Sequence, residues 1–123
     1  EEIDAMKPSL DNLSYTSYMV RVAYDESEVE VLAAVLSCAY SYEVIAKKIV
    51  ANRPESVDDP FYGDWIRGYA SDGYAAGNVI LIETLDRLSA HYTEEQLRHL
   101  EDIFIACSRY EMVFWQMAWE MRL

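Results

Sequence analysis

The chain has 123 residues, 52% of them hydrophobic and 26% charged, and its formal net charge is −12. This length and composition are typical of one globular domain with a real core, and they argue against a disordered chain. The negative charge argues against nucleic acid or an anionic membrane as a partner, because both bind clustered lysine and arginine. Two cysteines in a helical pattern indicate free thiols rather than a disulfide framework. With no run of 18 apolar residues and no visible signal peptide, we expect a cytoplasmic protein.

The first predicted helix follows a polar segment that ends at Pro8. Ser9 or Asp11 can cap this helix, which runs to about Tyr24. Its apolar residues fall into two stripes, one with Tyr15, Met19, Val22 and Ala23, the other with Leu10, Leu13, Ser17, Val20 and Tyr24.

A capping box formed by Ser27 and Glu30 predicts the start of a long helix that runs to about Ala51. Its main apolar stripe repeats at steps of three and four, which places the stripe on one face. Because other faces are apolar too, we expect a buried central helix. A thiol and a phenol on the main face are either core filler or the floor of a pocket. The stripe consists of Val31, Val35, Cys38, Tyr42, Ile45 and Ile49.

Three further segments lie between this long helix and the last one. Residues 52–60 contain two prolines and several charges, so we expect a loop. A short helix follows, from Tyr62 to about Ala70. After residues 71–73 a fourth helix runs to about Ala90, with Tyr74, Leu81, Leu85 and Leu88 facing inward.

The last predicted helix starts at a second capping box, formed by Thr93 and Gln96, and runs to about Met121. No strand-like alternation appears in the sequence. The fold class is therefore all-α, a bundle of about five helices with short connections.

The last helix carries an anomaly at Glu111. Seven of the eight residues in its apolar stripe are apolar or a thiol, and Glu111 interrupts them. A buried carboxylate needs a hydrogen-bonded partner, a raised pKa or a water-filled cavity. It is either a structural group bonded to a tyrosine or the backbone, or a general acid or base. The stripe is Leu97, Leu100, Phe104, Cys107, Glu111, Phe114, Ala118 and Met121.

The other candidate groups are ambiguous by themselves. A buried cysteine such as Cys38 usually behaves as a small hydrophobe, and Cys107 is interpreted as packing. Aromatic residues are core by default, which applies to Tyr15, Tyr42, Tyr69, Phe114 and Trp115.

No pattern predicts a metal or a cofactor. The two histidines, His91 and His99, lie near the polar start of the last helix and form neither a His-Glu-x-x-His nor a Glu-x-x-His motif. The four glycines are scattered, so no phosphate-binding loop exists.

Taken together, four segments resemble the TenA family, also called thiaminase II or aminopyrimidine aminohydrolase. The segments occur in the family's order, and the resemblance covers nearly the whole chain. They are residues 15–19 (Tyr-Thr-Ser-Tyr-Met), 38–43 (Cys-Ala-Tyr-Ser-Tyr-Glu), 65–71 (Trp-Ile-Arg-Gly-Tyr-Ala-Ser) and 110–115 (Tyr-Glu-Met-Val-Phe-Trp).

The resemblance implies a heme-oxygenase-like helical bundle, assembled as a homotetramer, that hydrolyses aminopyrimidines in thiamin salvage. Members release ammonia from 4-amino-5-aminomethyl-2-methylpyrimidine, cleave thiamin more slowly, and form hydroxymethylpyrimidine. By position, Cys38 is the expected nucleophile and Glu111 the expected acid/base. Tyr15 and Tyr42 are expected to hydrogen-bond near the thiol and ring. The pyrimidine is expected to lie against Tyr69 and Phe114.

The resemblance also implies that residues 1–123 are the C-terminal part of a single helical domain, without the family's N-terminal helices and the substrate-binding aspartate on them. We therefore expect this chain alone to be inactive or badly impaired, unless another chain supplies the missing half, and to expose apolar surface. Two alternatives stay open: a non-catalytic pyrimidine-binding or regulatory protein, and a helical interaction module with Cys38 and Glu111 in its core.

Overall fold

The computed structural model describes residues 5–122, and over this range the protein consists of five α-helices and one 3-10 helix without a strand. The predicted all-α class is confirmed. The elements are α2 (Leu10–Asp25), α3 (Glu28–Asn52), η1 (Pro54–Asp58), α4 (Gly63–Ala70), α5 (Asp72–Ser89) and α6 (Glu94–Glu120).

Hydroxyl side chains start the long helices. Ser9 accepts a hydrogen bond from the Asn12 backbone N–H at 3.2 Å, and thereby caps α2. Ser27 caps α3 and Thr93 caps α6, each in a complete capping box, as the sequence predicted. Each cap satisfies backbone N–H groups that the first turn of a helix leaves unpaired, which contributes about 1 kcal/mol.

The predicted boundaries needed small corrections. Residues 52–60 are not all loop, because Pro54 starts η1 in their middle. Helix α4 starts at Gly63, where a Cβ would lie 2.6 Å from the Val57 carbonyl oxygen, so only glycine lets η1 and α4 approach this closely. Helix α6 ends at Glu120, because Met121 takes a left-handed conformation with φ 51°.

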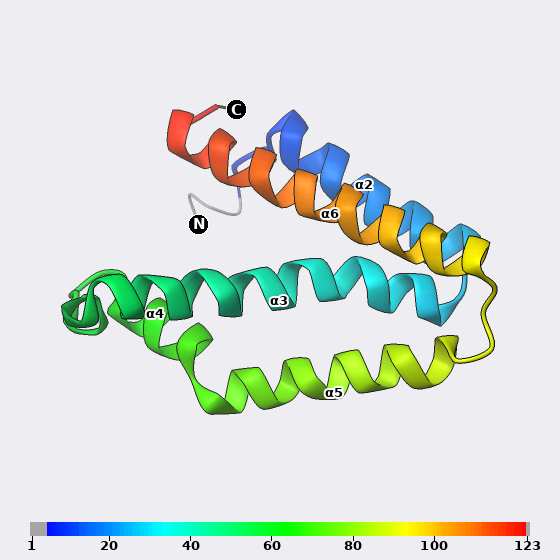
Figure 1. Cartoon of the computed structure of the whole chain (residues 1–123). Helices are drawn as coiled ribbons and strands as arrows, with labels where there is room; N and C mark the ends of the chain where they lie inside the picture. The colour runs from blue at the N-terminus through cyan, green and yellow to red at the C-terminus, as the bar shows by residue number, and fades with distance from the viewer. Residues whose placement is uncertain (1–4, 123) are drawn as a thin grey trace.

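Helix α3 is the centre of the bundle. It contacts every other helix, with α2 and α6 along one side and α4 and α5 along the other (Figure 1). Among the described helices α3 alone is long and apolar enough to cross a membrane, by length and composition only. Its contacts with all the other helices are those of a core helix, as the sequence predicted.

The core is formed where α2, α3 and α6 meet. Its buried residues are Tyr15, Val22, Val29, Ala33, Ala34, Leu100, Ile103 and Cys107. Cys107 is fully buried, in agreement with its interpretation as packing. Of the two stripes on α2, the one with Tyr15 and Val22 is the inner one, and the other is largely exposed.

The main stripe of α3 is less buried than predicted. Val35 and Ile45 are each 39% exposed, and Cys38 and Tyr42 are only half-buried. The most buried positions in the middle of α3 are small residues, Ala33, Ala34 and Ser37. Small side chains let neighbouring helices approach closely, whereas the larger residues of the stripe border open space.

Candidate functional site

Glu111 is buried on the inner side of α6. Its side chain is 8% exposed, and its Oε2 atom is inaccessible to solvent and has no hydrogen-bond partner among the described residues. It lies one helical turn after Cys107, so both side chains point from α6 into the bundle. A buried carboxylate oxygen costs about 1–3 kcal/mol or more unless a donor binds it, so this position calls for a donor from a neighbouring side chain or a bound molecule.

Cys38, on α3, is a close neighbour of Glu111. Burial, and next the negative charge of Glu111, raise the pKa of the Cys38 thiol to about 12. At neutral pH the thiol therefore keeps its proton, beside a group that can accept it. The thiol of the central helix and the carboxyl of the last helix, both singled out in the sequence, thus lie in one place.

Two tyrosines also adjoin Glu111. The pKa of Tyr15 and that of Tyr42 are raised, in each case first by burial and next by the charge of Glu111. The Tyr15 hydroxyl is buried without a hydrogen-bond partner in the described structure, and its ring stacks on Tyr110 with centroids 5.3 Å apart. Glu111 is therefore the common neighbour of one thiol and two phenols that all remain protonated at neutral pH.

Aromatic rings surround Tyr42. Its ring centroid lies 5.0 Å from that of Tyr69, 5.7 Å from Trp65 and 5.8 Å from Trp115. Phe114 joins this group through Trp115, with centroids 5.8 Å apart. The candidate wall residues Tyr69 and Phe114 thus come from α4 and α6, and both lie beside rings that contact Tyr42. Flat faces of this kind suit a planar heteroaromatic ligand.

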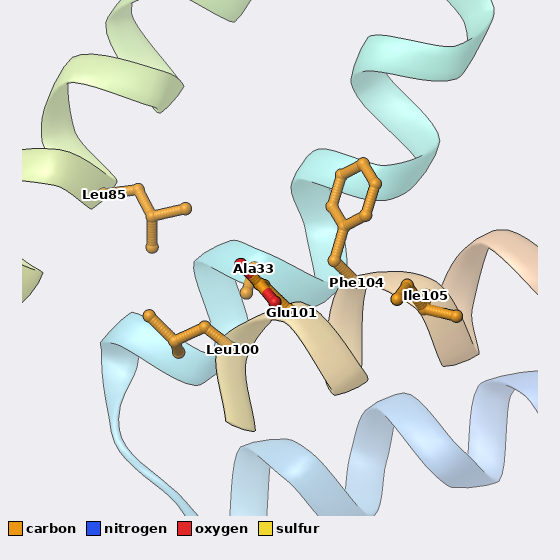
Figure 2. Close-up of a pocket in the computed structure, with 6 residues that line it drawn as sticks. All are labelled: Ala33, Leu85, Leu100, Glu101, Phe104 and Ile105. Carbon is orange, nitrogen blue, oxygen red and sulfur yellow. The ribbon is translucent and has the colours of Figure 1, made fainter. Parts of the chain in front are cut away.

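Two hollows lie away from the thiol and carboxyl. One, of about 660 Å³, is lined by Trp65 and Trp115 together with Ile45, Ile49 and Tyr62 among others. Figure 2 shows the second, of about 360 Å³, between α3, α5 and α6. Its lining is apolar apart from one carboxylate, and it contains no thiol: Ala33, Leu85, Leu100, Glu101, Phe104 and Ile105.

Sequence reasoning missed Asn78 on α5. This amide is buried beside the turn of α3 that carries Cys38, where it hydrogen-bonds to the Ala39 carbonyl. A single asparagine in an otherwise apolar run of α5 was the signal that could have found it. Elsewhere, no three His, Cys, Asp or Glu side chains gather as metal ligands would within residues 5–122.

The geometry supports covalent chemistry on a flat ring. A thiol next to a carboxylate can lose its proton to that carboxylate when it attacks, and the carboxylate can then pass the proton to the substrate. Two phenols supply further hydrogen-bond donors, and the aromatic group around Tyr42 supplies ring faces. No element of this site needs a metal or a cofactor for such a step.

Comparisons with known proteins show which family this chain resembles. Residues 1–121 match the model of the TENA/THI-4/PQQC family. Over 120 residues the chain is 41% identical to an aminopyrimidine aminohydrolase of Helicobacter pylori. This match covers 98% of this chain and 55% of that protein. An aminopyrimidine aminohydrolase of Halalkalibacterium halodurans is 41% identical over 100% of this chain and 54% of its own length. One of Bacillus subtilis is 34% identical over 97% of this chain and 49% of its own length.

The chain spans about half the length of the curated relatives it matches. The match nevertheless extends over almost all of its own residues and includes all four segments on which the resemblance rests. The chain belongs to the TENA/THI-4/PQQC family.

Proposed function

We propose that this chain forms the catalytic part of an aminopyrimidine aminohydrolase, which converts 4-amino-5-aminomethyl-2-methylpyrimidine, and more slowly thiamin, to hydroxymethylpyrimidine. The observation that carries the proposal is the buried carboxylate of Glu111 beside the protonated thiol of Cys38. The names of the relatives support the same reaction.

In the proposed first step, Glu111 takes the thiol proton as the Cys38 sulfur adds to a carbon of the pyrimidine ring. The carboxyl then gives that proton to the ring nitrogen, so that no net charge is created by the addition. Because the ring is no longer aromatic, electrons from the ring nitrogen expel the group on the methylene substituent. For the aminomethyl substrate, whose amine is protonated to an ammonium at neutral pH, the leaving group is neutral ammonia.

In the second half, water adds to the methylene carbon and its proton passes to Glu111. The carbon–sulfur bond to Cys38 then breaks as the Glu111 carboxyl returns its proton to the leaving sulfur, and the ring nitrogen loses its proton to water or to the released ammonia. This restores the thiol and the carboxylate, and the pyrimidine becomes aromatic again. Tyr15 and Tyr42 are proposed to hydrogen-bond near the thiol and ring. The aromatic group around Tyr42, with Tyr69 and Phe114, is proposed to hold the planar ring.

We further propose that a polypeptide segment outside these 123 residues, on the same or another chain, completes the site, and that it and neighbouring subunits cover the exposed apolar surface. Cys38 and Tyr42 are half-buried, and large apolar side chains are exposed on several helices, including Trp119, which is 85% exposed. A homotetramer would cover part of such surface. A further segment, on the same or another chain, would enclose the substrate from the open side.

The test compares hydroxymethylpyrimidine and ammonia release by the chain alone and by the chain mixed with the part of the Helicobacter pylori relative that it does not cover. We expect weak release alone, a large gain with the added part, and loss of that gain in Cys38→Ser with pyrimidine binding retained. Undiminished hydrolysis by Cys38→Ser would contradict the proposal. Binding without any hydrolysis in the mixture would favour the non-catalytic pyrimidine-binding alternative.

A further inference from the structure

We propose that Asn78 and Tyr74 of α5 are positioning residues, which hold the turn of α3 that carries Cys38 by binding the Ala39 carbonyl. The inference rests on the proposed function, because Cys38 is the reacting thiol there. It concerns the placement of that thiol and not the chemistry of the substrate.

Two consecutive carbonyls of α3 accept hydrogen bonds from side chains at this turn. The Tyr74 hydroxyl donates to the Ala39 carbonyl at 3.0 Å, and the Asn78 amide donates to the same oxygen at 3.1 Å. The Ser41 hydroxyl donates to the Cys38 carbonyl at 3.0 Å. In a regular helix these carbonyls serve only the backbone N–H four residues later. Added donors pull on carbonyls and bend a helix locally, so they fix the orientation of this turn.

Asn78 is fully used as a donor. It is 4% exposed, and besides Ala39 its amide nitrogen donates to Oε2 of Glu43 at 2.6 Å. An amide nitrogen carries two hydrogens, so both are accounted for. The other oxygen of Glu43 accepts from Lys47 at 2.6 Å. A buried polar side chain in an otherwise apolar run costs free energy unless it is bonded in this way, and an apolar residue could fill the same space.

Tyr74 has a second contact that leads to the same site. Its ring meets that of Tyr69 edge-on, with centroids 4.8 Å apart, and Tyr69 in turn lies 5.0 Å from Tyr42. Tyr42 follows Cys38 by one turn on the same stripe of α3. Helix α5 therefore restrains the backbone next to the thiol and, through two rings, the phenol above it.

The test is the alkylation rate of Cys38 by iodoacetamide across pH 7 to 10.5, resolved by mass spectrometry, in the 123-residue chain. Tyr74→Phe removes one hydroxyl and keeps the ring. Asn78→Asp removes both donor hydrogens at nearly constant size, and it adds a carboxylate beside that of Glu43, whose charge by itself would slow alkylation, so only a movement of the thiol makes the rate rise. We expect either variant to let the thiol move away from Glu111 and alkylate at least about threefold faster at pH 8, since half a unit in pKa corresponds to that factor. Fully buried Cys107 should stay unlabelled in both.

Two controls separate positioning from stability. Asn52→Asp makes the same chemical change at the exposed end of α3 and should leave the Cys38 rate unchanged. In Asn78→Asp combined with Glu43→Gln, the new amide at position 43 can donate to the new carboxylate at position 78. This double variant should regain the stability that Asn78→Asp loses. Its Cys38 should still alkylate faster than in the unmodified chain, because the Ala39 carbonyl still lacks its amide donor.

Three results would overturn the inference. The first is an unchanged rate of Cys38 alkylation in both single variants. The second is a parallel rise in the alkylation of Cys38 and Cys107, which reports general unfolding. The third is a Cys38 alkylation rate in the double variant that equals that of the unmodified chain. Since alkylation needs no turnover, a failure of the hydrolase proposal leaves this readout intact, and the two failures are distinguishable.

Discussion

The pairing of Cys38 with Glu111 makes a quantitative prediction for Glu111→Gln, which keeps the side chain's size but removes its charge. Burial is the first cause of the raised pKa of Cys38, about 12 against an ordinary 9.0, and the charge of Glu111 is the second. At pH 8 a pKa of 12 leaves about 10⁻⁴ of the thiol ionised, whereas a pKa of 9 leaves about 10⁻¹. Because the charge is only the second cause, its removal should recover part of this difference, and each unit by which the pKa falls raises the thiolate fraction about tenfold.

The assay is iodoacetamide alkylation of Cys38 at pH 8, read by peptide mass spectrometry with Cys107 as the internal measure of unfolding. Glu111→Gln should label Cys38 faster, by about tenfold for each unit by which the pKa falls, while hydroxymethylpyrimidine release by the completed enzyme falls by about 10² or more, because the proton carrier is lost. The rate of Cys38 alkylation thus rises while the rate of hydrolysis falls. An unchanged or slower alkylation would show that the carboxylate does not act on this thiol.

Three further predictions concern stability. Ile103→Ala should lower the free energy of unfolding by about 3 kcal/mol in urea titrations, because Ile103 is almost fully buried. Ile105 is half-exposed, so the control Ile105→Ala should lower the same free energy by less than about 1 kcal/mol. Thr93→Ala should cost about 1 kcal/mol by loss of the α6 cap, with unchanged slope in the same titration. The pKa of Cys38 (about 12) and that of Cys107 (about 11) lie above the unfolded value near 9, so the unfolded thiols ionise first. Stability should therefore be full below pH 9 and fall as the pH rises from 9 to about 12. In Cys107→Ala the fall between pH 9 and 11 should be less steep, and an equal slope in that variant would refute the assignment.

Local sequence signals predicted most of the fold. Capping pairs such as Ser27 with Glu30 act within one turn, so they predicted the starts of α3 and α6 without any knowledge of packing. The start of α4 involves, in contrast, a contact with another element. Gly63 starts α4 because its backbone lies against the Val57 carbonyl of η1, and nothing in the spacing of apolar residues shows that approach.

The site was partly predictable for a similar reason. Glu111 interrupts an apolar stripe, and that local anomaly indicated a buried carboxylate before its neighbours were known. The partial exposure of the stripe with Val35 and Ile45 was not predictable from periodicity, because it depends on which helices cover α3. Asn78 was missed because its role appears only when α5 packs beside Ala39, 39 residues away along the chain.

A protection experiment tests most directly whether Cys38 and Glu111 share one pyrimidine site. Alkylation of Cys38 is measured at rising concentrations of hydroxymethylpyrimidine, with Cys107 as the internal control. A common site predicts that the Cys38 rate falls to a plateau near zero, and that Glu111→Gln needs a higher concentration for the same protection. A Cys38 rate that stays constant at saturating pyrimidine would contradict it.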